Sequence, residues 1–264
     1  MAETSQLTAA PAGLPAVSRV TLLRIAIILT ILVVWEATAA SGLLFRDVVP
    51  SLLVIGRAVA SVLTENDFYW HLGVTAGEVG IGLLIGGVAG LVVGIALGAN
   101  RFMSQAFEHF LYYLGPTPKI IFFPVMIMWF GVGPGSKVAM GTISCFFPIA
   151  LSVGAGMRQI DEVLIRVGRS FRANTWQMVT KIYLPAMRAP IVNGVRLGLG
   201  VAIIGTLLAE TKLSNRGVGF LIINSYSTFN MPRMYALLIV LFVVAIGANA
   251  LVGRIGGVQA ERKR

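Results

Sequence analysis

Long unbroken runs of apolar residues, separated by short polar segments, dominate the chain. A helix needs about 20 mostly apolar residues to cross a bilayer. Six runs meet this requirement, and they cover residues 21–40, 73–98, 106–131, 138–157, 189–209 and 234–253. A transmembrane β-barrel would instead show segments of about ten residues that alternate in polarity. The pattern therefore predicts an all-α, polytopic membrane protein with about six transmembrane helices.

The composition supports this class. Of the 264 residues, 56% are hydrophobic and 12% are charged, and the mean hydropathy is +0.84. A soluble domain has about 25% charged residues, so a soluble enzyme is excluded. In a membrane protein the net charge of +10 indicates basic cytoplasmic loops and no nucleic-acid partner. Cys145 is the only cysteine, so it cannot by itself form a disulfide, a cysteine-based zinc site or an iron–sulfur cluster.

The distribution of basic residues predicts the orientation in the membrane. If the N-terminus lies inside, thirteen Lys and Arg residues fall on the inner side and six on the outer side. The outer six are Arg46, Arg57, Lys137, Lys212, Arg216 and Arg233, while Lys119 and Arg196 fall within apolar runs. Positive charge is enriched in cytoplasmic loops. We therefore expect both termini in the cytoplasm.

The ends of the chain are polar. Residues 1–18 are small, polar and Pro-containing, which predicts a disordered cytoplasmic tail. Residues 256–264 form a basic cytoplasmic tail. Residues 25–34 also resemble a signal-peptide core, with Ala37-Thr38-Ala39 as a cleavage site. Because the first 18 residues carry no Lys or Arg, we favour an uncleaved first transmembrane helix over residues 21–40.

Glycines recur at every fourth position of the second run. They are Gly82, Gly86, Gly90, Gly94 and Gly98. Positions four apart share one face of a helix, and small residues let helices approach closely in a membrane. These glycines predict a tightly packed helical bundle and do not indicate its function.

The third run combines prolines with a lysine. Pro116, Pro118 and Pro124 remove backbone donors and bend a helix, which is tolerated where the helix lines a cavity. Lys119 either extends to the membrane interface or faces a polar pathway. Glu36, Glu78 and Glu210 are either interface residues or interior partners. We expect a polar pathway through the membrane to involve Pro116, Pro118, Lys119, Pro124, Trp129 and Glu210.

The largest predicted inner loop, residues 158–188, predicts two short amphipathic helices. Asp161 caps the first, which runs to about Phe171. Asn174 and Gln177 form a capping box at the start of the second, which carries Trp176 and ends at Pro185. Such helices either lie on the membrane surface or present Phe171 and Trp176 to a cytoplasmic partner.

This loop resembles the coupling loop of the permease subunits of binding-protein-dependent ABC importers. The resemblance rests on Trp176 and on the ending Ile182-Tyr183-Leu184-Pro185. Further family patterns are Pro116-Thr117-Pro118 with Trp129-Phe130-Gly131, Phe146-Phe147-Pro148, Ala209-Glu210, and the run Arg216-Gly217-Val218-Gly219-Phe220-Leu221-Ile222. The resemblance covers about residues 70–255 and is most specific for the branch that imports nitrate, taurine and alkyl sulfonates.

The resemblance implies a type I ABC importer permease fold over residues 70–255, with the ATPase docked on residues 161–184. The implied coupling residues are Asp161, Glu162, Arg166, Gly168, Phe171, Arg172, Ala173, Trp176, Leu184 and Pro185. The family's glutamate falls on Arg166, its two alanines on Val167 and Gly168, and its turn glycine on Arg172. Because an arginine with positive φ is strained, we expect the local turn to differ.

ATP hydrolysis is expected in a separate chain, because no GxxxxGKS or GxxxxGKT sequence occurs here. This chain is therefore expected to be a transport subunit and not an enzyme, with no cofactor of its own and with ATP and Mg bound by the partner. The implied partners are an ABC ATPase dimer, an external substrate-binding protein, the lipid bilayer and a second permease chain, as a homodimer or a heterodimer. Lys119 and the excess of basic over acidic residues favour an anionic solute such as a sulfonate, taurine or nitrate.

Two other classes of membrane protein have sequence requirements of their own. An intramembrane protease would need a GxSG sequence near a histidine, and neither His71 nor His109 has one. An ion-coupled secondary transporter working without an ATPase needs carboxylates near mid-membrane, for which Glu78 and Glu210 are the candidates. Such a carrier has no need of the two-helix inner loop, so it remains the alternative.

Overall fold

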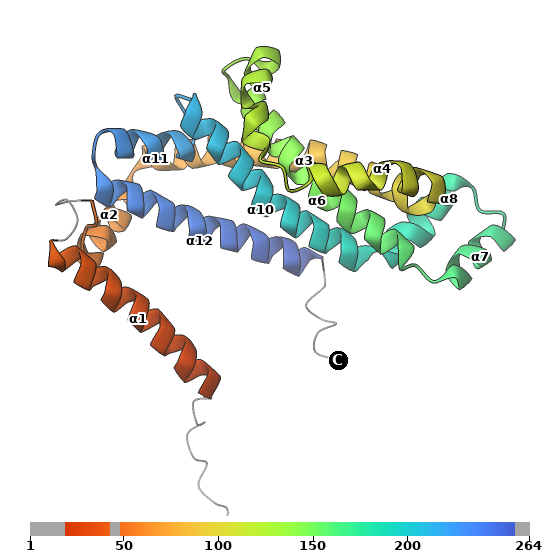
Figure 1. Cartoon of the computed structure of the whole chain (residues 1–264), viewed down its shortest axis with the longest axis horizontal. Helices are drawn as coiled ribbons and strands as arrows, with labels where there is room; N and C mark the ends of the chain where they lie inside the picture. Colours follow the sequence, from red (N-terminus) through yellow and green to blue (C-terminus); the bar gives the residue numbers. More distant parts are fainter. Residues whose placement is uncertain (1–18, 43–47, 257–264) are drawn as a thin grey trace, which may run out of the picture. The chain divides into compact units, whose positions relative to one another are not determined.

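The structure, a computed structural model, describes residues 19–42 and 48–256, and within these ranges every regular element is helical. The predicted tail 1–18 and residues 257–264 of the predicted basic tail lie outside the described residues. Figure 1 labels most of the elements. They are α1 (Arg19–Ser41), α2 (Leu52–Thr64), α3 (Asn66–Ala99), α4 (Arg101–Leu114), the 3₁₀ helix η1 (Lys119–Phe122), α5 (Phe123–Phe130), α6 (Pro134–Arg158), α7 (Glu162–Ser170), α8 (Thr175–Met178), the π-helix η2 (Val179–Tyr183), α9 (Leu184–Ala186), α10 (Arg188–Lys212), α11 (Val218–Ser227) and α12 (Met231–Ile255).

Five helices are long and apolar enough to cross a membrane, namely α1, α3, α6, α10 and α12. The sixth predicted transmembrane helix, residues 106–131, is not one straight helix. It consists of α4 and the segment η1–α5, which meet at an angle of 92°. Pro116 and Pro118 lie between the two parts, where a missing N–H and a fixed φ favour a break. If the bent pair is counted as one crossing, the described residues contain six segments long and apolar enough to cross a membrane, as the apolar pattern predicts.

The N-terminal compact unit ends at Ile55. In it, Trp35 of α1 donates a hydrogen bond from Nε1 to the Pro50 carbonyl at 3.1 Å. The Glu36 carboxylate accepts a hydrogen bond from the Leu52 amide at 2.9 Å, so Glu36 caps the first turn of α2. Glu36 therefore binds the backbone of the segment that follows α1.

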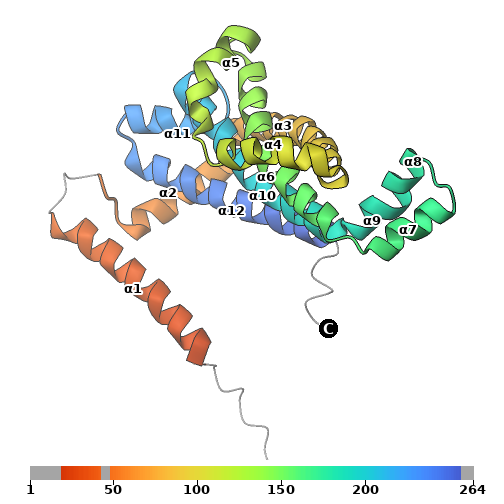
Figure 2. The ribbon, with the colours of Figure 1, turned by 45° about the vertical axis from the view of Figure 1, so that its right-hand side comes forward.

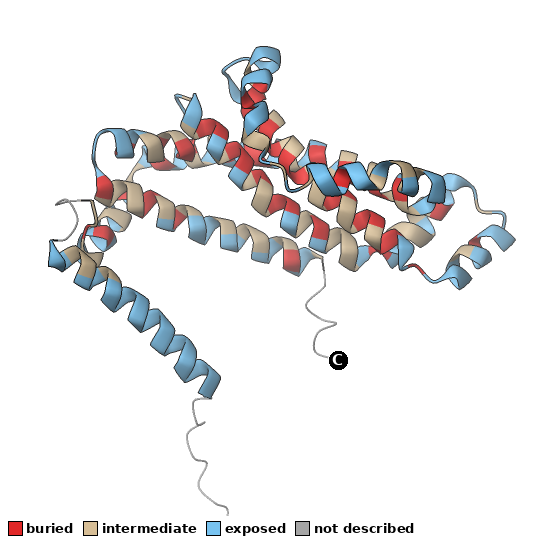
Figure 3. Cartoon of the chain, in the orientation of Figure 1, coloured by how far each residue is buried: buried red, intermediate tan, exposed pale blue. Residues whose placement is uncertain are grey.

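The second unit, residues 56–264, is organised around α6. One face of α6 packs against the glycine face of α3, and buried residues concentrate along this contact (Figure 3). A Cβ at Gly94 would lie 2.7 Å from both the Ala150 carbonyl oxygen and Val153 Cβ. The glycines of α3 thus lie where a side chain would separate the two helices.

A second face of α6 packs against small residues of α10. A Cβ at Gly194 would lie 2.9 Å from Ser152 Cβ, and one at Gly205 would lie 2.9 Å from the Met140 carbonyl oxygen. Because lipid does not drive apolar helices together, close van der Waals packing of this kind holds a membrane bundle. The bundle α3–α6–α10 is therefore a tightly packed scaffold.

Two ends of this bundle carry the features that concern function. At one end, α7, α8 and α9 form a projection that follows α6 and precedes α10 (Figure 2). At the other end lies α11, which packs with α12, α3 and the second half of α2 through Val62, Phe68, Val218 and Leu237. The segment η1–α5 also lies toward this second end (Figure 1).

Candidate functional site

The two-helix loop, residues 158–188, begins with a capped helix. The Asp161 carboxylate accepts a hydrogen bond from the Val163 amide at 2.8 Å, and Glu162 adds a second negative charge to the first turn of α7. Both acidic residues match the positive end of the helix dipole. The predicted cap at Asp161 is therefore present, and α7 ends at Ser170, one residue before the predicted end.

The turn after α7 places Arg172 in the left-handed region, with φ = 53°. The Ala173 amide donates to the Gly168 carbonyl at 3.0 Å, and the Arg172 amide donates to the Arg169 carbonyl at 2.9 Å. These two bonds define a Schellman motif, whose left-handed position glycine usually occupies. The expectation that this turn would differ is wrong, because the two hydrogen bonds hold Arg172 in a conformation that disfavours its side chain by about 1–2 kcal/mol.

The second helix of the loop begins with the predicted capping box. The Asn174 side chain accepts from the Gln177 amide at 2.8 Å, and the Gln177 side chain accepts from the Asn174 amide at 2.9 Å. The helix does not end at Pro185, as predicted, but continues to Ala186. The π-helical turn η2 explains this: the Leu184 amide bonds to Val179, five residues earlier, and this wider turn accommodates the proline ring.

The two helices of the loop pack on each other through Gly168. A Cβ at Gly168 would overlap Ile182 Cδ1 and lie 2.6 Å from Met178 Sδ, so a larger residue there would require the ends of these two side chains to shift. The packing leaves two aromatic side chains outside: Phe171 is 83% exposed and Trp176 is 73% exposed. Arg166 is exposed as well, and no described carboxylate lies within 4.0 Å of it. The loop is thus a preformed element with an apolar and cationic surface.

An ion pair ties α4 to the end of α6 from which this loop begins. Arg158 contacts both oxygens of Glu108, at 2.8 Å from Nη2 and 2.9 Å from Nη1. Ser104 donates a further hydrogen bond to the same carboxylate at 2.5 Å. The pair joins residues 50 positions apart, and no local pattern in the sequence indicates it. It fixes α4, the first part of the bent segment α4–η1–α5, against the base of the two-helix loop.

The bent segment holds its lysine close to the backbone. Lys119 Nζ donates to the Gly115 carbonyl at the end of α4 and lies 5.1 Å from the centre of the Phe147 ring. A cation there is favoured by the negative end of the α4 dipole. Pro124 lies in the first turn of α5, where its missing N–H costs no hydrogen bond within the helix. Trp129 is exposed on α5, and Pro116 and Pro118 are exposed at the bend.

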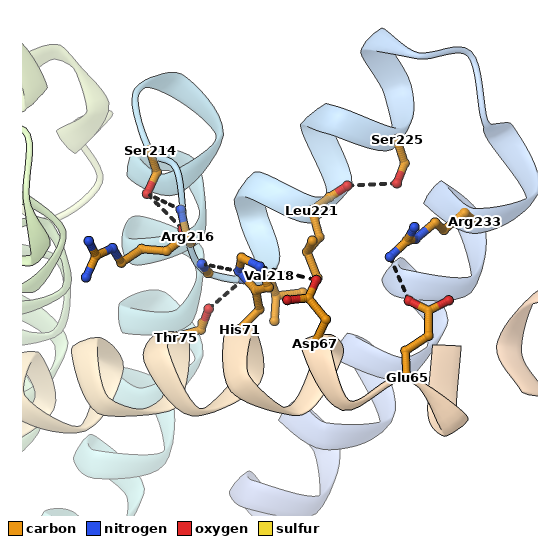
Figure 4. Close-up of polar contacts among 11 residues, drawn as sticks. Glu65, Asp67, His71, Thr75, Ser214, Arg216, Val218, Leu221, Ser225 and Arg233 are labelled. Atoms are coloured by element: carbon orange, nitrogen blue, oxygen red, sulfur yellow. Dashed lines mark hydrogen bonds and ion pairs between the residues drawn. The ribbon is translucent and has the colours of Figure 1, made fainter. Parts of the chain in front are cut away.

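A buried polar cluster holds the N-terminus of α11 at the other end of the bundle (Figure 4). The Gly217 amide donates to His71 Nδ1 at 2.9 Å, and the Val218 amide donates to Thr75 Oγ1 at 2.8 Å. The Gly219 amide donates to Glu210 Oε2 at 2.6 Å. Thus α3 and α10 supply the side-chain acceptors that a helix N-terminus otherwise lacks.

Glu210 is the centre of this cluster and is fully buried. Its other oxygen, Oε1, accepts from Thr75 Oγ1 at 2.7 Å. A Cβ at Gly217, whose φ is +94°, would overlap the Glu210 carboxylate. The motifs Ala209-Glu210 and Arg216 to Ile222, which residues 211–215 separate in the sequence, therefore meet at one site. Glu210 contacts protein on all sides in this structure, although we expected it in the pathway.

Glu78 and Lys137 extend the cluster toward α6. Lys137 is also buried, although we counted it with the outer loops, and its Nζ donates to the carbonyls of Val132 and of Leu213, the latter at 2.7 Å. Glu78 is buried, and its Oε2 has no hydrogen-bond partner among the described residues. A cavity of about 400 Å³ lies here, lined by Glu78, Val132, Gly133, Pro134, Lys137 and residues 213–216. The two carboxylates therefore face the interior, and the described residues contain no group of three metal-ligating side chains.

At the outer edge of the cluster, Glu65 pairs with Arg233 at 2.7 Å, which links the start of α3 to the start of α12 (Figure 4). The predicted site residues thus separate into three places. The coupling residues share the two-helix loop, the prolines with Lys119 and Trp129 share the bent segment, and Glu210 lies in the buried cluster. His71, Thr75, Glu78 and Lys137 complete that cluster but were not predicted as site residues.

Comparison with known proteins places this arrangement in a family. The model of the binding-protein-dependent transport system inner membrane component family matches residues 82–264. The chain is 28% identical over 81% of its length to the aliphatic sulfonates transport permease protein SsuC of Bacillus subtilis, of which it covers 78%. It is 27% identical to the taurine transport system permease protein TauC of Escherichia coli, over 90% of each protein.

A solved structure shares the fold. A chain of the MetNI methionine ABC transporter in an inward-facing conformation superposes with a TM-score of 0.60 at 20% identity, over 78% of this chain and 96% of that one. The matched helices and the extent of the family match agree with the resemblance drawn from the coupling loop. The chain is a multi-pass membrane protein that belongs to the family of inner membrane components of binding-protein-dependent ABC importers, in the branch of the sulfonate and taurine permeases.

Proposed function

We propose that this permease couples to a separate ABC ATPase pair through the two-helix loop, with residues 161–184 as the docking element. The observation that carries the proposal is the pair of exposed aromatic side chains, Phe171 and Trp176, on a loop whose two helices are capped and packed in advance. An apolar surface on a preformed loop is the arrangement by which a helix fills a groove on a partner protein. ATP and Mg would be bound entirely by that partner.

The loop is joined to the bundle in a way that transmits force. Met187, which connects α9 to α10, is fully buried, and Arg158 at the start of the loop pairs with Glu108 of α4. A push on α7 and α8 is therefore carried to α6, α10 and α4 together. In this proposal, closure of the ATPase pair rocks the permease between inward- and outward-facing states.

The pathway is proposed to run between two copies of this chain, beside the bent segment. That segment carries the residues expected there, Pro116, Pro118, Lys119, Pro124 and Trp129, and its bend exposes irregular backbone, which a membrane tolerates only beside a cavity or within protein. Glu210, the sixth expected residue, is proposed to act indirectly by holding the segment 213–219 in place. In this scheme a single copy of the chain forms only part of the pore. Both termini are proposed to lie in the cytoplasm.

The solute is proposed to be a small anion, such as an alkyl sulfonate, taurine or nitrate, delivered by an external binding protein. The support is the names of the relatives and the net charge of +10. Lys119 is the cationic group that the bent segment offers to an anion. Selection among anions is assigned to the binding protein.

The docking proposal is tested by co-expressing this chain with its cognate ABC ATPase and measuring co-elution from a sizing column in detergent. The double variant Phe171→Ala/Trp176→Ala is expected to lose co-elution, because it removes the exposed apolar surface. A matched control, Tyr226→Ala, removes an exposed aromatic side chain from α11 and should keep it. Retention of the ATPase by the double variant would contradict the proposal.

The alternative, an ion-coupled carrier working without an ATPase, makes the opposite prediction. Liposomes that contain only this chain would then take up taurine or nitrate when a proton or sodium gradient is applied. We expect no such uptake. The buried carboxylates Glu78 and Glu210, which such a carrier would use, lie in a cluster where Glu210 is already bonded to Thr75 and Gly219.

A further inference from the structure

Arg196 is a charged residue within a transmembrane helix that the proposed function does not use. It lies eight residues after the start of α10, which places its Cα about 12 Å along the helix. Its Nε donates to Asn249 Oδ1 of α12 at 2.8 Å, and Asn249 Nδ2 donates to the Arg196 carbonyl at 3.2 Å. Gly253 leaves room for the guanidinium, since a Cβ there would lie 3.4 Å from Cζ. Asn249 therefore holds Arg196 in one orientation against α12.

The guanidinium has no counter-charge in the part of the chain that the structure describes. No described carboxylate lies within 4.0 Å of it, and no described group accepts a hydrogen bond from Nη1 or Nη2. Ionisable side chains inside a membrane are rare, and they face a partner or a polar pathway. Four N–H donors of Arg196 are thus available to an anion.

An apolar groove of about 650 Å³ begins at this arginine and runs between α10 and α12. Among the described residues that line it, Arg196 and Asn249 are the only ones with polar side chains, and the rest are apolar residues of α10, as far as Leu208, and of α12. From Arg196 to Leu208 the groove extends about 18 Å along α10. One leaflet of a bilayer has a hydrocarbon layer of about 15 Å, half of the full thickness. The groove therefore has the length of one acyl chain.

We propose that this groove binds an anionic phospholipid, with the phosphate on the Arg196 guanidinium and one acyl chain along α10 and α12. The groove is polar at one end and apolar along the rest, which is the pattern of a phospholipid. The fork of N–H donors suits a phosphate oxygen pair. Basic pockets between transmembrane helices bind anionic headgroups in this way. Phosphatidylglycerol fits because its headgroup has no positive charge to repel the guanidinium, whereas that of phosphatidylcholine does.

The first test compares two lipids on the unmodified protein. The purified chain is titrated in detergent with phosphatidylglycerol or with phosphatidylcholine, and bound lipid is counted by native mass spectrometry. One tightly bound phosphatidylglycerol per chain is expected, with phosphatidylcholine bound about tenfold more weakly, because its phosphate can still bind the guanidinium but its choline cation repels it. Equal binding of the two lipids would overturn the proposal.

Variants then locate the site. Arg196→Gln should weaken phosphatidylglycerol binding at least about tenfold, and Arg196→Lys by less, since it keeps the charge but not the fork. Arg254→Gln removes an exposed arginine of the neighbouring helix α12, next to Gly253, and should leave binding within about twofold. Wild-type affinity in Arg196→Gln would show that the lipid binds elsewhere, and the proposal would be wrong.

Filling the groove provides a test that leaves the arginine intact. A Cβ at Gly200 meets no atom within 4 Å, and Gly200 lines the groove, so Gly200→Leu places a side chain where the acyl chain would lie without a clash. It should displace the lipid without lowering the thermal unfolding temperature of the lipid-free protein, because leucine favours the helix more than glycine does. Gly247→Leu is the matched control, because Gly247 is equally open but does not line the groove. If Gly200→Leu instead breaks the association of two chains, the groove is a protein contact and the lipid proposal fails.

Discussion

Adjacent glycines of α3 make it possible to measure how closely α3 packs on α6. A Cβ at Gly86 would lie 2.5 Å from the Thr142 carbonyl oxygen and 2.5 Å from Cys145 Sγ. A Cβ at Gly87 would meet only Ile149 Cδ1, at an ordinary 3.7 Å. Gly86→Ala and Gly87→Ala are therefore the same chemical change on the same helix, and they differ only in what the added methyl group meets.

The expected difference in the free energy of unfolding between the two variants follows from two contributions. Replacing glycine by alanine inside a helix stabilises it by about 1 kcal/mol, and this term is the same at both positions. Overpacking a close contact destabilises by about 1–3 kcal/mol, because backbone must move to accommodate the methyl group. The second term applies only to Gly86, where the nearest obstacle is a backbone oxygen. Gly86→Ala should therefore be about 1–3 kcal/mol less stable than Gly87→Ala.

The assay is thermal unfolding in detergent, followed by tryptophan fluorescence. For a chain of this length 1 kcal/mol corresponds to about 2–4 °C, so the two variants should differ by about 2–12 °C. Gly82→Ala provides an intermediate case, because its Cβ would lie 3.1 Å from the Val138 carbonyl oxygen. The expected order, from the most to the least stable variant, is Gly87→Ala, Gly82→Ala and Gly86→Ala. Equal unfolding temperatures for the Gly86 and Gly87 variants would refute the packing argument.

Three other changes test the loop, the buried cluster and the bent segment. Arg172→Gly removes the left-handed strain after α7, so hydrogen exchange of the amides in residues 168–174 should slow about two- to fivefold, from a gain of about 0.5–1 kcal/mol, whereas Arg172→Ala should not slow it. Thr75→Val leaves the Val218 amide and one oxygen of Glu210 without their partner and should lower stability by about 1–3 kcal/mol in the same unfolding assay, while Thr75→Ser should restore it. Lys119→Met should reduce uptake of an anion by the reconstituted importer but leave co-elution with the ATPase intact; unchanged uptake would mean that the lysine only caps α4.

The features that sequence patterns predicted are those decided by neighbours along the chain. The caps of the two-helix loop depend on contacts two and three residues apart, from Asp161 to Val163 and from Asn174 to Gln177. The bend between α4 and α5 follows from prolines, which act on their own backbone. The position of the transmembrane helices follows from apolar length alone. Each of these is a local property of the chain.

The contacts that the sequence patterns did not predict join residues that are far apart in the sequence. Glu210 and Thr75 are 135 positions apart, and Gly217 and His71 are 146 apart. No local pattern shows that Lys137 turns inward to the Leu213 carbonyl, 76 positions away. The continuation of the helix through Pro185 was missed for another reason. A π-turn changes the hydrogen-bond register by one residue, and sequence rules for proline assume the α-helical register.

The packing of α10 constrains how the proposed importer can open. Arg188 is the last residue of the two-helix loop and the first of α10, and Glu210 lies 22 residues later, about 33 Å along the same helix. Between them, Gly194 and Gly205 face α6 at distances that allow no side chain, so α10 cannot slide along α6 without separating from it. Packed helices of this kind move as a unit or change between discrete arrangements.

A push on the loop must therefore move α3, α6 and α10 together, or break the bonds of Glu210 to the amide of Gly219 and to Thr75. These bonds are buried, and losing either leaves a polar group without a partner, at about 1–3 kcal/mol each. Rotation of one whole chain against its partner breaks none of them. If the proposed function holds, intact bundles rock and α11 does not act as a local gate, so a disulfide engineered between α10 and α11 should leave transport unimpaired.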